Sequence, residues 1–402
     1  MRVAIVGQGY VGLPLAISIS DAGHEVIGFD LNEKVVNSLN LGVSHVEDIS
    51  NQVLAEAIRT GRYRASSDQA DLAITEVAII AVPTPLGKNR LPDLSFVESA
   101  SEILGRNLGS SALIVNESTS YPGTLRNVIA PIVAKFSKHE NFFAISPERV
   151  DPGNSKWGIK NTPRLFAGLT PDAGKRTSDF YGTFCDNIIE VSSPEVAETA
   201  KLFENTFRQV NIALVNELAV ICNKLGISAH EVLEAANSKP YGFMKFNPGI
   251  GVGGHCIPVD PTYLAYAAAK VGAEARFIEM ANEVNLAMPN ELISRIKKDN
   301  GGKLKGKKVI VFGIAYKPNV ADMRESPSLI LISNLRDEGA VVSWHDPLVK
   351  EWLGEKSADL DSSQFDIGVS AIIHDVMDLQ KIKNSVEYLI DCTGKIKEAV
   401  QF

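Results

Sequence analysis

Short apolar runs alternate with segments of helical periodicity through the first half of the chain. Five of these runs are rich in β-branched residues and predict strands, at Arg2–Val6, Glu25–Asp30, Val77–Val82, Ala112–Glu117 and Phe142–Ile145. Strands that alternate with helices are typical of a parallel sheet covered by helices. Each run ends in Gly, Asp, Pro or Ser, which predicts loops at the carboxyl edge of the sheet, where such sheets bind ligands.

A long uninterrupted helix is predicted next, over Glu195–Leu225. This segment contains no Gly or Pro, and its apolar residues recur at helical spacing. Ser193-Pro194 supplies an N-cap and a first-turn proline, and Gly226 ends the helix. At ~1.5 Å per residue the helix exceeds ~40 Å. We therefore expect a spine between two domains, whose apolar faces also serve a homodimer interface.

The last third of the chain repeats the plan of the N-terminus. After a joint rich in Lys and Gly at 297–308, a strand runs into a turn at Gly313-Ile314-Ala315, and a helix covers Ser328–Leu335. A second strand then ends in Asp346, as an earlier one ends in Asp30. The second turn lacks the full glycine pattern of the first, so we expect a different nucleotide there.

The predicted fold class is α/β, with two Rossmann-like parallel-sheet domains joined by a central helical domain that contains the spine helix. The expected domains are 1–190, 191–300 and 301–402. A length of 402 residues agrees with two or three domains, at roughly 150 residues each.

Composition narrows the class of protein. The chain is 45% hydrophobic and 22% charged, as in soluble globular proteins. A net charge of −8 argues against nucleic acid or anionic membranes as main partners. No apolar run is long enough to span a bilayer, and the N-terminus enters a strand without a hydrophobic leader. We expect a cytoplasmic protein.

Cysteines and histidines do not suggest a metal site. The four cysteines lie far apart without CxxC spacing, which fits a reducing compartment. His255 and Cys256 are adjacent, so they cannot both face one metal from a regular element, and no second cluster completes a site. No metal is expected.

The first turn carries the pattern GxGxxG at Gly7, Gly9 and Gly12. A predicted strand precedes it, a helix follows, and Asp30 ends the next strand at the distance of a ribose ligand. Such glycines let the backbone approach a pyrophosphate at a helix N-terminus. Because an acid at position 30 repels a 2′-phosphate, NAD is expected rather than NADP, although Lys34 is also within reach of the ribose. The alternative is a purely structural turn.

Motifs spread over nearly the whole chain resemble the UDP-glucose/UDP-N-acetylhexosamine 6-dehydrogenase family, which includes GDP-mannose dehydrogenases. They are, in order, GYVGLPLA, VPTP, STSYPG, SPERVDPG, AKLFENTFR, GVGGHCIPVDP and KPNVADMRESPS. The resemblance implies oxidation of C6 of a nucleotide sugar from alcohol to acid with two NAD⁺. It also implies an N-terminal Rossmann domain, a central helical dimerisation domain and a C-terminal domain that binds the nucleotide diphosphate.

By this resemblance Cys256 is the nucleophile. Its thiolate captures the C6 aldehyde as a thiohemiacetal, oxidation gives a thioester, and water releases the acid. The glycines before it, Gly254 among them, would let the sugar nucleotide lie against backbone N–H groups. Without the motif, a buried structural cysteine would be the better interpretation. Asp260 is expected to activate the water as a general base, the alternative being a simple turn at PVDP.

Lys201 and Asn205 lie four residues apart on the spine helix and share a face. The resemblance makes Lys201 the group that stabilises negative charge on the C6 oxygen, and Asn205 a partner of that oxygen or of the water. By spacing alone, a surface lysine paired with Glu198 or Glu204 is the better interpretation.

Further roles come from the remaining motifs. Glu148 would handle protons or bind the sugar, the alternative being a solvated side chain paired with Arg149. Ser120 keeps the hydroxyl of a residue that is Thr in many relatives, and is expected to order water or bind the cofactor. Lys317 and Arg324 are expected to reach the substrate from the third domain, Arg324 also contacting the cofactor, unless they are surface charges beside a helix cap. The remaining cofactor contacts expected are Tyr10, Val11 and Thr84.

The substrate class is expected to be a UDP-N-acetylhexosamine, UDP-N-acetylglucosamine or UDP-N-acetylmannosamine. Arg149 in SPERVDPGN and the segment KPYGFMKFNPG look more like the members that act on these sugars, and Arg149 would donate to the acetamido group. The alternatives are a UDP-glucose 6-dehydrogenase, a single-step alcohol dehydrogenase with a structural Cys256, and a non-catalytic NAD-binding regulator.

Overall fold

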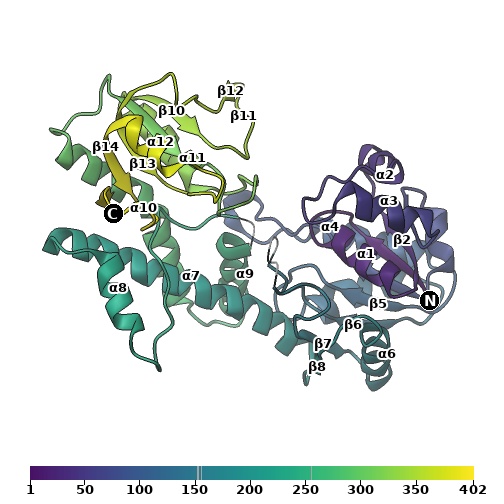
Figure 1. Cartoon of the computed structure of the whole chain (residues 1–402). Helices are drawn as coiled ribbons and strands as arrows, with labels where there is room; N and C mark the ends of the chain where they lie inside the picture. Colours follow the sequence, from purple (N-terminus) through teal and green to yellow (C-terminus); the bar gives the residue numbers. More distant parts are fainter. Residues whose placement is uncertain (152–153, 155, 255) are drawn as a thin grey trace. The chain divides into compact units, whose positions relative to one another are not determined.

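The computed structural model describes residues 1–402 except 152, 153, 155 and 255. The chain forms two compact units (Figure 1). The first contains Met1–Glu204 and Thr262–Ala273, and the second contains Asn205–Pro261 and Glu274–Phe402. Two helices, α7 (Pro194–Leu225) and α9 (Cys256–Lys270), contribute residues to both units.

The first unit is built on an eight-stranded sheet of order β3-β2-β1-β4-β5-β6-β7-β8. All neighbours pair in parallel except β6 and β7, which are antiparallel. The strands are β1 (Arg2–Val6), β2 (Glu25–Phe29), β3 (Tyr63–Ser66), β4 (Val77–Ile80), β5 (Leu113–Asn116), β6 (Phe142–Ile145), β7 (Arg164–Gly168) and β8 (Ile188–Glu190). Its helices, besides parts of α7 and α9, are α1 (Gly12–Asp21), α2 (Glu33–Asn40), α3 (Asn51–Arg59), α4 (Ser95–Asn107), α5 (Ala130–Phe136) and α6 (Pro171–Tyr181), with short turns at Gln69–Ile74, Lys88–Arg90 and Leu125–Ile129.

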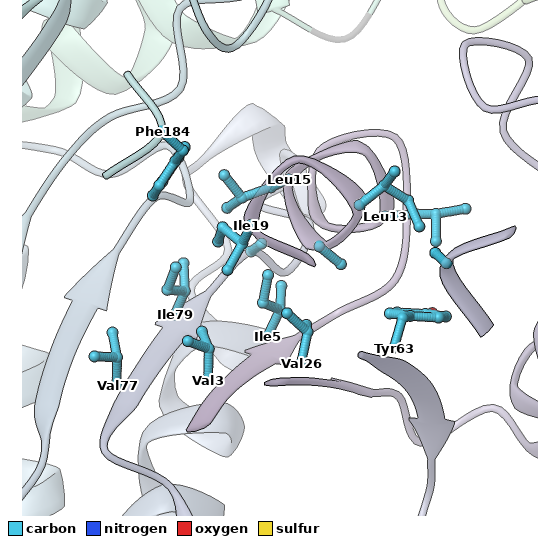
Figure 2. Close-up of a cluster of buried hydrophobic side chains, with 14 of the residues drawn as sticks. Val3, Ile5, Leu13, Leu15, Ile19, Val26, Tyr63, Val77, Ile79 and Phe184 are labelled. Atoms are coloured by element: carbon cyan, nitrogen blue, oxygen red, sulfur yellow. The ribbon is translucent and has the colours of Figure 1, made fainter. Parts of the chain in front are cut away.

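The predicted strands are confirmed to within two residues at each end, while β3, β7 and β8 were not predicted. Both faces of the central strands are apolar, which is why their sequences read as continuous runs. One face packs against α1. Figure 2 shows side chains of α1 directed at those of the strands, with Leu13, Leu15 and Ile19 on the helix, and Val3, Ile5, Val26, Tyr63, Val77 and Ile79 on the strands.

Helix α7 is one residue longer than predicted and begins at the first-turn proline, Pro194. Ser193 Oγ accepts a hydrogen bond from Val196 N at 3.3 Å, the N-cap expected from the sequence. At the other end Gly226 has φ +73°, and Ile227 N donates to Cys222 O at 3.0 Å. This left-handed ending satisfies a carbonyl of the last turn.

The second unit contains a five-stranded parallel sheet of order β10-β9-β13-β14-β15. The strands are β9 (Lys308–Phe312), β10 (Val341–His345), β13 (Phe365–Ser370), β14 (Val386–Asp391) and β15 (Val400–Gln401), beside a hairpin of β11 (Glu351–Trp352) and β12 (Glu355–Lys356). The helices are α8 (Ala229–Asn237), α10 (Arg276–Asp299), α11 (Pro327–Asp337) and α12 (Leu379–Asn384). Buried side chains of α10 and α11, such as Leu292 and Leu331, share one core with Val309 and Trp344 of the sheet.

Two α/β sheets, parallel except for the β6–β7 pair, and a long central helix are present, as the sequence predicted. Among the residues that the structure describes, no helix is both long and apolar enough to cross a membrane.

Candidate active site

The three glycines of the first βα turn, Gly7, Gly9 and Gly12, have different structural roles. Gly7 has φ +98°, and a Cβ there would lie 2.6 Å from Ala81 O. A Cβ on Gly12 would lie 1.8 Å from Gly7 O, so the helix could not start so close to the strand. A Cβ on Gly9 would meet no atom within 4 Å. Gly7 and Gly12 are therefore needed for packing. Gly9 leaves bare backbone facing open space, as a bound pyrophosphate requires.

Asp30 follows β2 and lies against this turn. Its Oδ2 accepts a hydrogen bond from Gln8 N at 2.9 Å, and its Oδ1 accepts one from Asn32 N at 2.9 Å. The buried Gln8 side chain is anchored by Ile5 O, at 3.0 Å, and by the Tyr63 hydroxyl, at 2.9 Å. Asp30 is itself partly exposed, so its carboxylate keeps lone pairs for a ribose. The residues present thus fit the adenosine half of NAD.

Other predicted cofactor contacts lie in the same unit. Tyr10 is 40% exposed and Val11 half-buried in the turn, Lys34 is exposed on α2, and Thr84 is buried after β4, with its carbonyl oxygen 3.2 Å from the Tyr263 hydroxyl. Their roles toward a cofactor stay predictions.

Lys201 is buried, with 7% of its surface exposed, so the interpretation of a surface lysine is wrong. Its Nζ donates to Thr119 Oγ1 at 2.6 Å, in the loop after β5. Glu204, one of the two acids offered as its partner, instead binds the Arg149 guanidinium at 2.6 Å. Burying an ammonium group costs free energy. Because buried charged groups of this kind cluster at functional sites, the burial favours a role for Lys201 at the site.

The loop after β5 is held by Glu198, the other acid offered as a partner of Lys201. The carboxylate accepts hydrogen bonds from Ser120 Oγ at 3.2 Å, Gly123 N at 2.6 Å and Leu125 N at 3.1 Å. Asn116 Nδ2 donates to Ser120 Oγ at 3.2 Å, so both sides of this buried hydroxyl are engaged. Burial raises the pKa of Glu198 to about 7, despite the N–H groups that lower it.

Glu148 is not paired through its side chain with the Arg149 guanidinium. It belongs to a buried cluster in which Arg164 bridges two carboxylates, at 3.0 Å from Glu148 Oε2 and 2.8 Å from Glu117 Oε1. The Tyr181 hydroxyl donates a hydrogen bond to Glu117. Sequence reasoning missed Glu117 and Arg164: Glu117 ends a predicted strand, but nothing in the sequence marks Arg164.

The pKa values of the two carboxylates in this cluster are shifted in opposite directions. Burial raises the pKa of Glu117 to about 7, because the Arg164 charge offsets it only in part and the Glu148 charge adds to it. Burial acts on Glu148 too, but Arg164 and the backbone N–H groups of Arg149 and Val150 outweigh it and lower the pKa. Glu148 is therefore held as a carboxylate.

Arg149, predicted to face an acetamido group, is largely committed within the protein. Its Nε and Nη2 bind Glu204, at 3.1 and 2.6 Å, and its Nη1 donates to Pro163 O at 2.7 Å. Because a guanidinium has five N–H groups, donors remain for a ligand.

Cys256 and Asp260 lie on the first two turns of α9. The PVDP segment is helical and Pro261 lies inside the helix, so the alternative of a simple turn is wrong. Cys256 is exposed, unlike the other three cysteines, and is no core residue. Asp260 is fully buried, and its Oδ2 accepts a hydrogen bond from Asn205 Nδ2 at 2.6 Å. Residues on two helices, α7 and α9, thus form one polar group one helical turn from the thiol.

The glycines before Cys256 make room for protein. Gly254 has φ +81°, and a Cβ there would lie 2.7 Å from the Tyr316 ring, while its N–H donates to Arg324 O at 2.9 Å. A Cβ on Gly253 would lie 2.8 Å from Glu325 O. Segment 316–325 therefore occupies part of the space beside these glycines. That a sugar nucleotide also lies against their backbone N–H groups stays a prediction.

Lys317 and Arg324 lie in this same segment. Arg324 is exposed, and its Nη2 lies 2.6 Å from Asp322 Oδ2, while Lys317 Nζ lies 5.6 Å from the centre of the Tyr316 ring. Ser326 precedes α11 as its N-cap residue. Both cations are therefore close to the glycine loop, and their contacts with a ligand stay predictions.

The second βα turn copies the first in backbone and differs in chemistry. Gly313 has φ +80°, and its N–H donates to His345 O at 2.9 Å, as Gly7 N donates to Phe29 O at 2.8 Å. Asp346, however, is fully buried, and its Oδ2 accepts from Ile314 N at 2.9 Å and Ala315 N at 3.2 Å and contacts His374 Nε2 at 3.1 Å. A phosphate at this turn would meet a buried carboxylate, so the turn does not fit a dinucleotide.

Outside positions 152, 153, 155 and 255, no group of three His, Cys, Asp or Glu residues could hold a metal ion. His255, considered for a metal with Cys256, lies outside the described residues.

Comparison with known protein families covers most of the chain. Residues 1–185 match the NAD binding domain of the UDP-glucose/GDP-mannose dehydrogenase family, residues 195–287 its central domain, and residues 310–394 its UDP binding domain.

Individual relatives agree. A UDP-N-acetyl-D-glucosamine 6-dehydrogenase of Pseudomonas aeruginosa is 35% identical over 87% of this chain and 83% of its own length. A UDP-N-acetyl-D-mannosamine dehydrogenase of Pyrococcus horikoshii is 35% identical over 87% of this chain and 84% of its own length. The solved structure of a UDP-D-ManNAc dehydrogenase from Pyrococcus horikoshii has a TM-score of 0.89 at 31% identity, covering 100% of this chain and 98% of that one.

A UDP-glucose dehydrogenase from Pyrobaculum islandicum has a TM-score of 0.90 at 27% identity, covering 100% of this chain and 96% of that one. The family resemblance seen in the motifs is thereby confirmed over the N-terminal, central and C-terminal parts. The chain belongs to the UDP-glucose/GDP-mannose dehydrogenase family, whose first domain binds NAD.

Proposed function

We propose that this protein oxidises C6 of a UDP-N-acetylhexosamine twice, from primary alcohol to carboxylate, with two NAD⁺ and a covalent intermediate on Cys256. The observation that carries the proposal is the hydrogen bond from Asn205 to the buried Asp260, one helical turn after the exposed Cys256. Lys201, one turn before Asn205 on α7, adds a buried cation.

NAD⁺ supplies a hydride acceptor for each of the two oxidation stages. The turn at Gly7, Gly9 and Gly12 would hold its pyrophosphate and Asp30 its ribose. The bare backbone at Gly9 and the partial exposure of Asp30 support this assignment.

Cys256 makes the second stage possible. Its thiolate adds to the C6 aldehyde, a C–S bond forms, and the former carbonyl oxygen takes a proton. The added sulfur turns the carbonyl carbon into one that again carries an alcohol and a removable hydride. Its position at the first turn of α9 favours the thiolate, because a helix N-terminus stabilises negative charge.

Water then hydrolyses the thioester. The C–S bond breaks, the sulfur leaves as thiolate, and the carboxylate product forms. Asp260 would accept the proton of that water, and the hydrogen bond from Asn205 supports this role because it orients the carboxylate. Lys201 would stabilise negative charge on the C6 oxygen in both stages, and Glu148, held ionised by Arg164, would accept a hydrogen bond from sugar or water.

The choice of an acetamido sugar is supported by two relatives, one named for UDP-N-acetyl-D-glucosamine and one for UDP-N-acetyl-D-mannosamine. Arg149 keeps N–H groups beyond those bound to Glu204 and Pro163 for the acetamido oxygen. The UDP-glucose dehydrogenase of Pyrobaculum islandicum keeps UDP-glucose as the second candidate. Lys317, Arg324 and Gly254 would contact the substrate.

NADH produced by limiting sugar tests the proposal. UDP-N-acetylglucosamine, UDP-N-acetylmannosamine, UDP-glucose and UDP-galactose are each supplied below the NAD⁺ concentration. Two NADH per molecule of one acetamido sugar are expected. One NADH per sugar would instead indicate a single-step dehydrogenase, activity only with UDP-glucose would remove the role of Arg149, and no NADH from any sugar would favour a regulator.

The variant Cys256→Ser separates the two stages. It should fold and bind NAD as the wild type does, yet release no more than one NADH per sugar, because an aldehyde would remain at C6. Cys222→Ala, a change at a buried cysteine of α7, is the control and should still give two. Two NADH per sugar from Cys256→Ser would remove the nucleophile assignment.

We also propose a homodimer in the cytoplasm, where NAD and nucleotide sugars are available. Large apolar side chains on α7 remain exposed at helical spacing, among them Leu214 at 62%, Ile221 at 46% and Leu225 at 67%. Such a stripe favours a partner helix, and a second copy of α7 is the simplest one. Light scattering should give twice the monomer mass, and Leu214→Glu should reduce it.

The three-domain division at 190 and 300 stays a prediction.

A further inference from the structure

We propose that Glu198 is a positioning residue for this reaction, which sets the Ser120 hydroxyl and the 119–125 loop against the face of α7 that carries Lys201. The inference rests on the proposed function, because it assigns Glu198 a part in the same chemistry.

The Glu198 side chain makes its hydrogen bonds to a single short segment, residues 120–125. Its carboxylate accepts three hydrogen bonds, all from residues 120–125, and only 1% of its surface is exposed. Two of the donors are backbone N–H groups, Gly123 N and Leu125 N, at the start of the helical turn Leu125–Ile129. One side chain therefore fixes both the conformation of the loop and the direction of the Ser120 hydroxyl.

Lys201 lies three residues later on α7 and binds the same loop. Its Nζ donates to Thr119 Oγ1 at 2.6 Å, next to the Ser120 that donates to Glu198. Side chains three apart share a helix face, so an acid and a lysine of one face grip neighbouring residues of one loop. A shift of Glu198 would therefore move Ser120 and the environment of the Lys201 ammonium together.

The surrounding charges do not neutralise Glu198. Glu195 lies one turn earlier on α7 and is paired with Arg126 of the Leu125–Ile129 turn at 2.7 Å, and Lys201 follows on the same face. Within the loop, the Tyr121 hydroxyl accepts a hydrogen bond from Lys270 Nζ of α9 at 3.3 Å. The Glu198 charge is thus stabilised chiefly by N–H and O–H donors, which ties its ionisation to the conformation of the loop.

The test compares Glu198→Gln with Glu195→Gln, a control on the same helix whose carboxylate is partly exposed and bonded to Arg126. Glu198→Gln keeps the size of the side chain but turns one acceptor into a donor that faces backbone N–H groups. The expected loss in kcat is about 10- to 100-fold, with the KM for NAD⁺ and UDP-sugar changed less than about threefold. Glu195→Gln should stay within about twofold of wild type.

A double-variant cycle with Ser120→Ala shows whether Glu198 acts through Ser120. If it does, the kcat of the double variant should equal that of the less active single variant, to within about twofold. Losses that multiply, or a Glu198→Gln variant with wild-type kcat, would overturn the proposal. Should Glu198→Gln fail to fold, Glu198→Asp takes its place, since it keeps the charge and withdraws it by one methylene.

Hydrogen exchange separates this proposal from the proposed function. Amide protection at Gly123 and Leu125 should fall at least about tenfold in Glu198→Gln and stay unchanged in Glu195→Gln, with no substrate added. Unchanged protection would overturn the positioning role even in an active enzyme. If protection falls while wild type oxidises none of the four sugars, the role of Glu198 in the loop stands and the proposed function fails.

Discussion

Asn205 Nδ2 donates a hydrogen bond to Asp260 Oδ2 at 2.6 Å, and this contact joins the middle of α7 to the second turn of α9. Asp260 is fully buried, so its carboxylate depends on such donors in place of water. The thiol of Cys256 is on the same helix, one turn away. The orientation of a proposed base is therefore set by an amide on another helix.

We expect Asn205→Ala to impair catalysis and stability together. Loss of a hydrogen bond to a buried carboxylate costs about 1–3 kcal/mol, and thioester hydrolysis should slow more than the first oxidation because Asp260 is no longer held. Urea unfolding measures the effect on stability. Hydrolysis follows the second NADH, so in the variant a burst of two NADH per enzyme should keep its rate while the steady-state rate falls. Asn211→Ala is the control, because Asn211 Nδ2 only donates to Phe207 O of its own helix. Equal slowing of the NADH burst and of steady-state turnover would contradict the role given to Asp260.

Glu117 provides a test by pH. Its pKa is raised to about 7 by burial, above the usual value near 4.5, so the folded protein holds a proton there that the unfolded chain has released. Stability from this group is present below pH 4.5 and is lost as pH rises toward 7. In that window Glu117 contributes a slope of about −1.4 kcal/mol per pH unit.

Glu117→Gln should remove this slope. Its free energy of unfolding should fall less steeply than that of wild type between about pH 5 and 7. Glu198, with a pKa also raised to about 7, should keep its own contribution in the variant. Urea unfolding at several pH values measures the difference, and Glu102→Gln, at an exposed carboxylate paired with Arg106, is the control. Parallel curves for Glu117→Gln and wild type would show that Glu117 is ionised throughout.

Asp30 should decide the choice of cofactor. In Asp30→Asn the side-chain oxygen can still accept from Gln8 N, so the turn should keep its shape. The variant loses the charge that repels a 2′-phosphate, and the ratio of kcat/KM for NADP⁺ to that for NAD⁺ should rise about tenfold or more. Asp21→Asn, at the end of α1, is the control. An unchanged ratio would place cofactor discrimination elsewhere.

The sequence predicted those features whose cause is local. The strand runs, the glycine turn before α1 and the capped α7 all follow from neighbouring residues, and each lies within two residues of its predicted place. The strands β3, β7 and β8 were missed because their sequences, YRAS, RLFAG and IIE, contain charged residues and lack the continuous apolar runs of the central strands. Cys256, Asp260, Lys201 and Asn205 were named through the family resemblance, which no periodicity could replace.

What the sequence did not predict is which charges meet. One alternative interpretation paired the Glu148 side chain with Arg149. Instead, Arg149 binds Glu204 and Glu148 binds Arg164, and each partner comes from a different element. Asp346 was taken as the counterpart of Asp30, yet it is closed off by His374. Such choices depend on three-dimensional burial, since a carboxylate excluded from water takes the nearest donors whatever their place in the chain.

Asn216 provides the last prediction, because it supports the loop that carries Cys256. This buried side chain accepts from Gly249 N at 2.9 Å and donates to Asn285 Oδ1 at 2.9 Å, while Asn285 Nδ2 donates to Gln209 O at 3.3 Å. A Cβ on Gly251 would lie 2.8 Å from Asn285 O, so the loop and α10 are in close contact. The position of the loop before the thiol is therefore linked to a polar ladder between α7 and α10.

We expect Asn216→Leu to cost about 1–3 kcal/mol of stability, because Gly249 N and Asn285 Oδ1 lose their partner. The rate at which iodoacetamide alkylates Cys256 should also change, since the sulfur is exposed and its surroundings move with the loop. Leu218→Ala, at a partly buried position on the same helix, is a control that lacks these polar contacts and should leave the alkylation rate unchanged. If Asn216→Leu is destabilised but Cys256 reacts at the wild-type rate, the ladder stabilises the fold without positioning the nucleophile.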